Sequence, residues 1–331
     1  MECTRNLDDD EDNDGSIMTR LPAELVVHVA TLLPVSSLPY FSTVNSRMHV
    51  ACHSTCVKHI LTHWDNFMES IVTHARVDLI KEALASMSSV PSTHISRLMF
   101  TACMVGRLAL LDELVTHITA EMDSKQINVA FQVAAKMGQL GAAQWLHDNC
   151  KFSLDPCSNN NYAFRFAANN GHLHVLQWLV DTFACVNPSE FDCAGFRWAA
   201  ANGHLHVVQW LVESYPACIN PCAREGEAFL RAAAGGHLHV ITWLQSHFPN
   251  IMEDQVEVCF WAALTHGHLP VLQYLAAHFS FTQFTGTHAR NAFHNAVAAD
   301  SMSALQWVWE THTELYKFSK FSTFTFAKSF I

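Results

Sequence analysis

The sequence predicts an all-α solenoid of stacked helix–turn–helix repeats. The first indication is a repeat of nearly constant period, whose copies are anchored 31 to 33 residues apart on Gly106, Gly138, Gly171, Gly203, Gly236, Gly267 and Asp300. A fixed period of this length is typical of a solenoid in which each repeat is one small supersecondary unit. The second and third indications are two apolar stripes, one before and one after each anchor.

The stripe before each anchor predicts the first helix of a unit. Alanine stands four residues before the anchor in every copy: Ala102, Ala134, Ala167, Ala199, Ala232, Ala263 and Ala296. Seven residues before it stands Met99 in the first copy and phenylalanine in the others, at Phe131, Phe164, Phe196, Phe229, Phe260 and Phe293. Positions three apart share one helix face, so this pair predicts a buried face. The small alanine predicts the close approach of another helix.

The stripe after each anchor predicts the second helix, because aliphatic residues recur two and eight residues after it. Glycine at the anchor suits a tight turn, since positive φ costs it little. Asp155-Pro156, Asn187-Pro188 and Asn220-Pro221 predict turns that end the second helix. A recurring aromatic residue is expected to pack between units, at Trp145, Trp178, Trp210, Trp243, Tyr274 and Trp307.

The repeat resembles the ankyrin repeat, whose consensus runs T-P-L-H-x-A-A-x-x-G over a period of 33. In one copy Ala163-Phe164-Arg165-Phe166-Ala167-Ala168 stands where that family has P-L-H-x-A-A, and Gly171-His172-Leu173 follows in register. The resemblance covers residues 99–310. No copy keeps the Thr-Pro start, so the β-hairpin finger of ordinary ankyrin repeats is left open. A degenerate eighth unit is placed around residues 75–80.

Composition and charge limit the partners. The net charge is −11, and residues 1–15 carry seven acidic residues against Arg5, which predicts a solvated, disordered tail. The rest of the chain shows no basic stripe, so nucleic acid is not an expected partner. Neither a signal peptide nor a bilayer-spanning stretch is found. Eleven cysteines without compact disulfide spacing predict free thiols, and hence the cytoplasm or nucleus, or the host cytoplasm for a viral protein.

The segment 18–64 resembles the F-box, on the residues Leu21, Pro22, Glu24, Leu25, Leu32, Leu33, Pro34, Leu38, Val44 and Arg47. Met48 replaces the tryptophan of that family, and Pro39 comes early. The resemblance implies docking to a Skp-type adaptor of a cullin ubiquitin ligase, through Leu21, Pro22, Leu25, Leu33, Pro34, Leu38 and Val44. The alternative is a helical cap that only seals the apolar end of the solenoid. The combination is similar to proteins of giant viruses, amoebae and oomycetes.

Two constellations suggest metal chemistry, and both are interpreted as structural. Cys52, Cys56, His59 and His63 share a helix face, but span about 16 Å, too far for one ion. A metalloenzyme using this stretch is the weakest alternative. The His-x-His pairs that follow the anchors are two residues apart and so do not face each other on a helix; local hydrogen bonding is expected of them. No catalytic motif is found, so no catalytic residue, metal or cofactor is predicted.

The function expected is that of a monomeric adaptor, with the solenoid holding a target protein near the ligase; a ligase-independent scaffold is the alternative. The predicted target-binding strip comprises the two residues before each turn glycine, which differ between copies: Lys136, Met137, Asn169, Asn170, Ala201, Asn202, Ala234, Gly235, Thr265 and His266. The competing interpretation is that nothing constrains these positions. The predicted organisation is a tail over 1–17, the F-box-like module over 18–64, seven to eight repeats over 65–312, and a cap or tail over 313–331.

Overall fold

The computed structural model describes residues 80–81, 84, 92–150, 154–279 and 294–311. The F-box-like segment 18–64, both terminal tails and nearly all of the possible eighth unit lie outside the described residues. The chain divides into two compact units, one comprising residues 1–134 and 141–154 and the other residues 135–140 and 155–331. Each is described by itself below.

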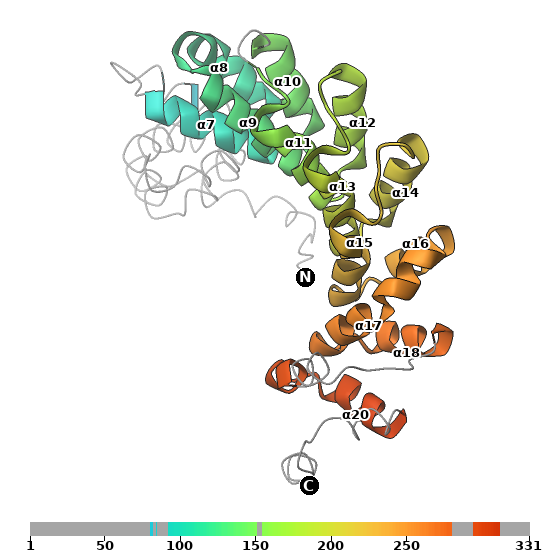
Figure 1. Cartoon of the computed structure of the whole chain (residues 1–331). Coiled ribbons are helices and arrows are strands. Elements are labelled where there is room, and N and C mark those ends of the chain that lie inside the picture. The colour runs from blue at the N-terminus through green and yellow to red at the C-terminus, as the bar shows by residue number, and fades with distance from the viewer. Residues whose placement is uncertain (1–79, 82–83, 85–91, 151–153, 280–293, 312–331) are drawn as a thin grey trace, which may run out of the picture. The chain divides into compact units, whose positions relative to one another are not determined.

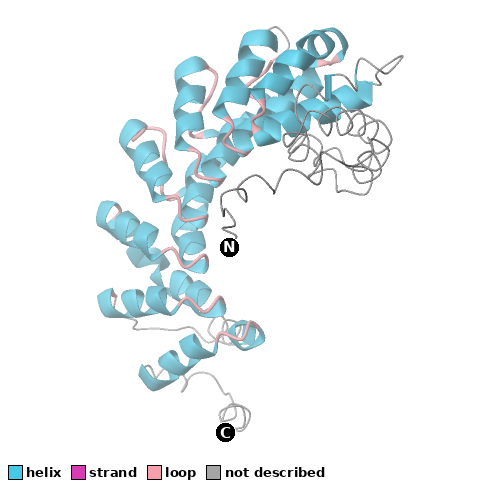
Figure 2. Ribbon diagram, turned by 180° about the vertical axis from the view of Figure 1, so that it is seen from behind, coloured by secondary structure: helices cyan, strands magenta, loops and turns pink. Residues whose placement is uncertain are grey.

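The predicted helix–turn–helix repeat is confirmed. The first helices are α7 Ser92–Val105, α9 Ser124–Lys136, α11 Ser158–Asn169, α13 Glu190–Ala201, α15 Ala223–Ala234 and α17 Pro249–Thr265. The second helices are α8 Leu108–Glu121, α10 Leu140–Cys150, α12 Leu173–Thr182, α14 Leu205–Ser214, α16 Leu238–His247, α18 Leu269–His278 and α20 Met302–Thr311. The described residues are helices and connecting turns, without a strand and therefore without a β-hairpin finger (Figure 2). The fold is an all-α, ankyrin-like solenoid.

Each turn glycine ends its first helix in the left-handed conformation, as predicted. At Gly203 φ is 78°. The backbone N–H of His204 donates to Ala199 O at 2.9 Å, and that of Gly203 donates to Ala200 O at 3.2 Å. This pair of bonds is the Schellman motif, which satisfies the last carbonyls of a helix. Asp300 takes the same conformation in the last described hairpin, with φ of 55°.

In the first unit, α7 packs against α8, and side chains join successive hairpins. The indole Nε1 of Trp145 donates to Asp112 Oδ1 at 2.6 Å, one hairpin earlier. That contact agrees with the expectation that the recurring aromatic residue packs between units. A reciprocal pair of bonds between Asp123 and Gln126 caps the start of α9.

In the second unit, the first helices α11, α13, α15 and α17 pack in succession, and far more extensively than the second helices do (Figure 1). The cause is the small residue four before each turn glycine. Ala167, Ala199 and Ala232 are fully buried, as are the phenylalanines three residues earlier. Alanine lets the helices approach, and phenylalanine fills the space between them.

The connectors contain a feature that the sequence did not predict. The Asp155, Asn187 and Asn220 side chains each accept the backbone N–H two residues later, so these are turns as expected. A second turn follows, in which three consecutive residues adopt φ between 51° and 73°: 159–161, 191–193 and 224–226. Most are not glycine, although this conformation costs an ordinary residue about 1–2 kcal/mol. These segments are called the left-handed turns below.

Arginine side chains hold two of the left-handed turns. Arg165 donates from Nε to Asn160 O at 2.7 Å and from an Nη to Asn159 O at 2.8 Å. Arg197 makes the same two bonds to the turn at 191–193, at 2.8 and 3.0 Å. The third turn has no arginine at this position, but its last residue is Gly226, which tolerates positive φ. Two turns are therefore held by an arginine in the same way, and the third relies on a glycine instead.

Candidate target-binding surface

Three aromatic side chains form a continuous strip on the first helices of two successive hairpins. The rings of Tyr162 and Phe166 stack with their centroids 4.0 Å apart, and Phe166 meets Trp198 edge-on at 5.3 Å. These residues stand nine and five positions before a turn glycine, and all three are only half-buried. Tyr162, Phe166 and Trp198 are called the aromatic strip below. Half-exposed aromatic rings next to each other are typical of protein-binding surfaces.

Cationic groups lie against this strip. The Lys136 Nζ is 5.5 Å from the centroid of Phe166. The guanidinium of Arg165 lies between Phe191, at 4.8 Å, and Trp198, at 5.3 Å. Burial lowers the pKa of the Arg165 guanidinium below its usual value, with Tyr162 acting in the opposite direction. Phe191 belongs to a left-handed turn and is 47% exposed, so the turn extends the aromatic surface beyond the helices.

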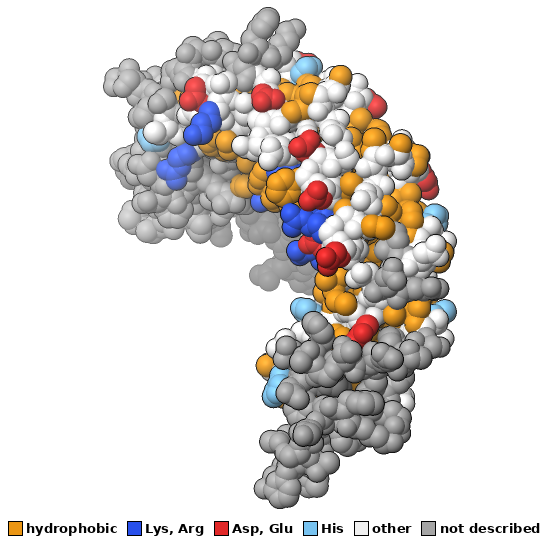
Figure 3. All heavy atoms as spheres, viewed as in Figure 1, with side chains coloured by type: hydrophobic (Ala, Val, Ile, Leu, Met, Phe, Trp, Pro, Cys, Tyr) orange, Lys and Arg blue, Asp and Glu red, His pale blue; other side chains and the backbone are white. Residues whose placement is uncertain are grey.

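Beyond the aromatic strip, in the direction of α15, the surface is formed by ion pairs and not by aromatic rings. The Glu227 carboxylate pairs with both Arg197 and Arg231. Burial acts to raise the pKa of Glu227, but hydrogen bonds and charge from these two arginines outweigh burial, so the pKa is lowered. Asp192 and Arg224, from successive left-handed turns, pair at 3.3 Å. Figure 3 accordingly shows basic and acidic side chains side by side over α11–α15.

The predicted strip next to the turns lies beside the aromatic strip, and part of it bonds between repeats. Asn202 Nδ2 donates to Asn169 Oδ1 at 2.9 Å and also to Trp198 O. Asn169 Nδ2 donates in turn to Asn170 Oδ1, and Asn170 Nδ2 donates to Lys136 O at 2.6 Å. These asparagines join three successive turns. They combine an inter-repeat contact with at least partial exposure.

The other predicted positions differ in exposure. Met137, Asn202, Gly235 and His266 are exposed, while Lys136, Ala201, Ala234 and Thr265 are half-buried. Thr265 and His266 side chains bond to carbonyls of their own helix. The aromatic strip and Phe191 were missed by sequence reasoning. The signal was present, because the positions nine and five before the anchor also differ between copies.

The His-x-His pairs are structural, as predicted, but their bonds are not local. His174, His206 and His239 each donate from Nε2 to the turn glycine of the preceding repeat, at 2.8–3.0 Å. The first histidine of each pair, at 172, 204 and 237, bonds to the carbonyl two residues before that glycine. His268, which Pro270 follows in place of a second histidine, bonds in the same way to Ala234 O at 2.7 Å. Together the two rings clamp successive turns to each other.

This histidine clamp predicts acid sensitivity. Burial lowers the pKa of His172, His204 and His237 below the usual 6.5, and neighbouring histidines lower it further. The unfolded chain therefore binds more protons than the folded chain as the pH falls below about 6.5. The contribution of these residues is complete above that pH and is lost below it. We expect a lower Tm at about pH 5 than at about pH 7.5, measured by circular dichroism.

The matched control replaces all three histidines by asparagine, which cannot titrate. That variant is expected to show a shallower dependence of Tm on pH over the same window. Equal slopes for the two proteins would place the acid sensitivity elsewhere.

One cysteine expectation is wrong for this structure. Cys157 and Cys185 form a disulfide, with Cα atoms 6.3 Å apart, although the sequence predicted free thiols. The bridge joins two successive connectors, which the repeat brings together but which lie 28 residues apart in the chain. Spacing in the sequence gave no sign of it, because the pairing runs between repeats and not within a compact motif. The other described cysteines are free: Cys103, Cys150, Cys193, Cys218, Cys222 and Cys259.

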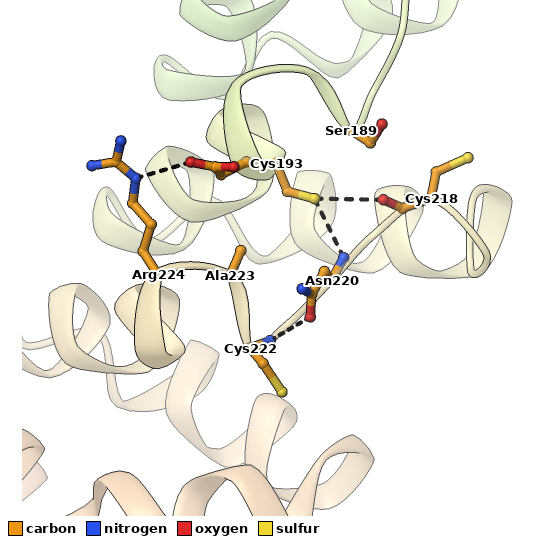
Figure 4. A pocket seen from close by; sticks show the side chains of 8 residues that line it. Ser189, Cys193, Cys218, Asn220, Cys222, Ala223 and Arg224 are labelled. Atoms are coloured by element: carbon orange, nitrogen blue, oxygen red, sulfur yellow. Dashed lines mark hydrogen bonds and ion pairs between the residues drawn. The ribbon is translucent and has the colours of Figure 1, made fainter.

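The next connector encloses a hollow of about 420 Å³. It lies between the start of α13 and the start of α15, and its lining includes Ser189, Cys193, Cys218, Asn220 and Cys222 (Figure 4). Three thiols therefore share one small cavity. Among the described residues, no three histidine, cysteine or acidic side chains are placed to hold a metal ion. The four residues considered above as metal ligands, Cys52, Cys56, His59 and His63, lie outside the described residues.

Comparison with known proteins agrees with this geometry. Residues 131–221 match the family model described as ankyrin repeats, in three copies. Residues 131–221 are therefore assigned as ankyrin repeats. Ankyrin repeats are protein–protein interaction modules, and the matched segment, shorter than the resemblance over 99–310, includes the whole aromatic strip.

No curated protein matches the chain. Among solved structures, an ankyrin repeat family protein from Legionella pneumophila is 18% identical, with coverage of 92% of this chain and 90% of its own and a TM-score of 0.37. None of the helices in the described part of the chain has the length and apolar character that crossing a membrane requires.

Proposed function

We propose that the ankyrin repeats hold a target protein on the surface made by the first helices and the left-handed turns. The observation that carries this proposal is the aromatic strip, in which Tyr162, Phe166 and Trp198 remain half-exposed although they contact one another across two repeats. Exposed aromatic side chains beside arginine are the composition that protein interfaces favour. The predicted positions Asn169 and Asn202 flank the strip and would contribute polar contacts.

The test of this function uses two matched tryptophans. Trp198 lies on α13 in the aromatic strip, whereas Trp210 lies on α14 of the same hairpin, packed edge-on against Tyr215 at 5.5 Å. Both are half-buried. We expect Trp198→Ala to reduce target capture by the full-length protein about tenfold or more, as loss of a central aromatic contact typically does, and Trp210→Ala to leave capture intact. Capture is quantified by affinity purification and mass spectrometry.

Circular dichroism of both variants separates loss of binding from loss of folding. If both tryptophan variants capture the target as well as the wild type, the surface is not used. The connector loops around Pro156, Pro188 and Pro221 would then become the next candidates.

We further propose that residues 18–64 dock a Skp-type adaptor, which makes the chain a substrate receptor of a cullin ubiquitin ligase. The support is the F-box-like pattern of apolar residues and two Leu-Pro steps in the sequence. Tethering would raise the concentration of the target near the ligase, so the chain would act as an adaptor and would need no catalytic residue of its own. The cytoplasm or nucleus is the location that this role requires. The second candidate is a ligase-independent scaffold.

The docking proposal predicts the effect of a double change, Leu21→Ala with Pro22→Ala. We expect this full-length variant to lose co-purification with a Skp-type adaptor, while the repeats unfold at the same temperature as in the wild type. The reason is that both side chains are assigned to the adaptor interface and not to the core of the solenoid. A micromolar Kd corresponds to a binding free energy of about −8 kcal/mol, which is a modest affinity. If the wild type does not bind a cognate adaptor at about micromolar concentration, the ligase-independent scaffold remains as the function.

A further inference from the structure

The repeat places a second thiol pair one step beyond the disulfide. Cys157 stands two residues after Asp155, and Cys185 stands two residues before Asn187. In the next step along the solenoid, Ser189 occupies the position of Cys157, and Cys218 occupies that of Cys185. The position that would complete a second bridge is thus a serine. Four residues after Ser189 stands a free thiol, Cys193.

Cys193 lies against the backbone of Cys218. Its Sγ donates to Cys218 O at 3.5 Å and accepts the backbone N–H of Asn220 at 3.3 Å. Cys193 is buried and Cys218 is exposed. The Cys218 sulfur points away from Cys193 in Figure 4, so a bond between the two sulfurs requires the exposed Cys218 side chain to turn toward Cys193. Both residues line the same hollow.

We propose that Cys193 and Cys218 are a redox-active pair, which a disulfide oxidant such as oxidised glutathione converts into a second cross-link between repeats. The Cys218 thiolate attacks one sulfur of the oxidant, which forms a mixed disulfide and releases one glutathione thiolate. Cys193 then loses its proton and attacks the Cys218 sulfur, and the second glutathione leaves as a thiolate. Two protein thiols lose two electrons and two protons, and one glutathione disulfide becomes two glutathione thiols.

The cross-link would act on the left-handed turn. Cys193 is the third residue of the turn at 191–193, which displays Phe191 beside Arg165. Joining Cys193 to the connector before α15 restrains this turn in addition to the bonds that Arg197 makes to it. The reduced and oxidised proteins should therefore differ in the mobility of residues 191–193, whether or not the surface binds a target.

The competing pair is Cys218 with Cys222, because Cys222 also lines the hollow and is exposed. The Cys222 sulfur points away from Cys218 in Figure 4, and no hydrogen bond joins the side chains of Cys218 and Cys222 in the described structure. Of the two free thiols in the hollow besides Cys218, only Cys193 contacts the Cys218 residue. This contact favours the Cys193–Cys218 pair.

The test equilibrates full-length protein with graded mixtures of oxidised and reduced glutathione, blocks free thiols by alkylation, and maps disulfides by peptide mass spectrometry. We expect a Cys193–Cys218 linkage that increases with the share of oxidised glutathione and persists in Cys222→Ser. Cys218→Ser, at an exposed position, should abolish it while Cys157–Cys185 remains. A Cys218–Cys222 linkage, glutathione retained on Cys218 without a linkage, or no change at Cys193 would each overturn the proposal.

Discussion

Gly203→Ala is expected to destabilise the repeats by about 2–5 kcal/mol, which is the sum of two costs. Alanine at φ of 78° is strained by about 1–2 kcal/mol. A Cβ at this position would also lie 2.6 Å from Nδ1 of His237, which belongs to the next repeat. Overpacking of this kind typically costs a further 1–3 kcal/mol, roughly. Urea unfolding followed by circular dichroism measures the loss.

A double variant separates the two costs. His237→Ala removes the ring that the new Cβ would strike, so Gly203→Ala combined with His237→Ala should lose less stability than the two single variants summed. The strain of positive φ remains in the double variant. Strict additivity would show that the ring contact is not part of the cost.

Ala199→Leu is expected to lower the stability by about 1–3 kcal/mol, because it adds volume where α13 packs against both neighbouring first helices. Ala199 is fully buried. The matched control is Ala201→Leu on the same helix, since Ala201 is half-buried at the predicted strip. Thermal unfolding should place the control much closer to the wild type. If both variants lose equal stability, the assignment of the buried face is wrong.

The sequence was sufficient for the repeating fold because one physical demand recurs in every copy. Each hairpin needs a small residue for helix approach, a large apolar residue for the core and a residue that accepts positive φ at the turn. The left-handed turns were not predicted because their sequences share nothing: Asn159-Asn160-Asn161, Phe191-Asp192-Cys193 and Arg224-Glu225-Gly226. Arg165 and Arg197 hold the first two turns by equivalent bonds, whereas the third relies on Gly226, so no one residue type marks the conformation in the sequence.

The candidate surface was only partly predictable for a related reason. Spacing shows which residues share a helix face, and so it placed Asn169 and Asn202 at the exposed end of their helices. It does not show which turn stacks on which, and the histidine bonds and the Cys157–Cys185 disulfide both run between repeats. The aromatic strip also depends on stacking, since Phe166 and Trp198 meet only when α11 and α13 pack together.

The central claim is that a target protein contacts the first-helix face of the ankyrin repeats. Photo-crosslinking tests it most directly, with benzoylphenylalanine placed in full-length protein at Phe166 in the aromatic strip or at Trp210 on the second helix. Both substitutions put one aromatic group in place of another. We expect a specific crosslinked partner from position 166 and none from position 210. Crosslinking from position 210 alone would contradict it.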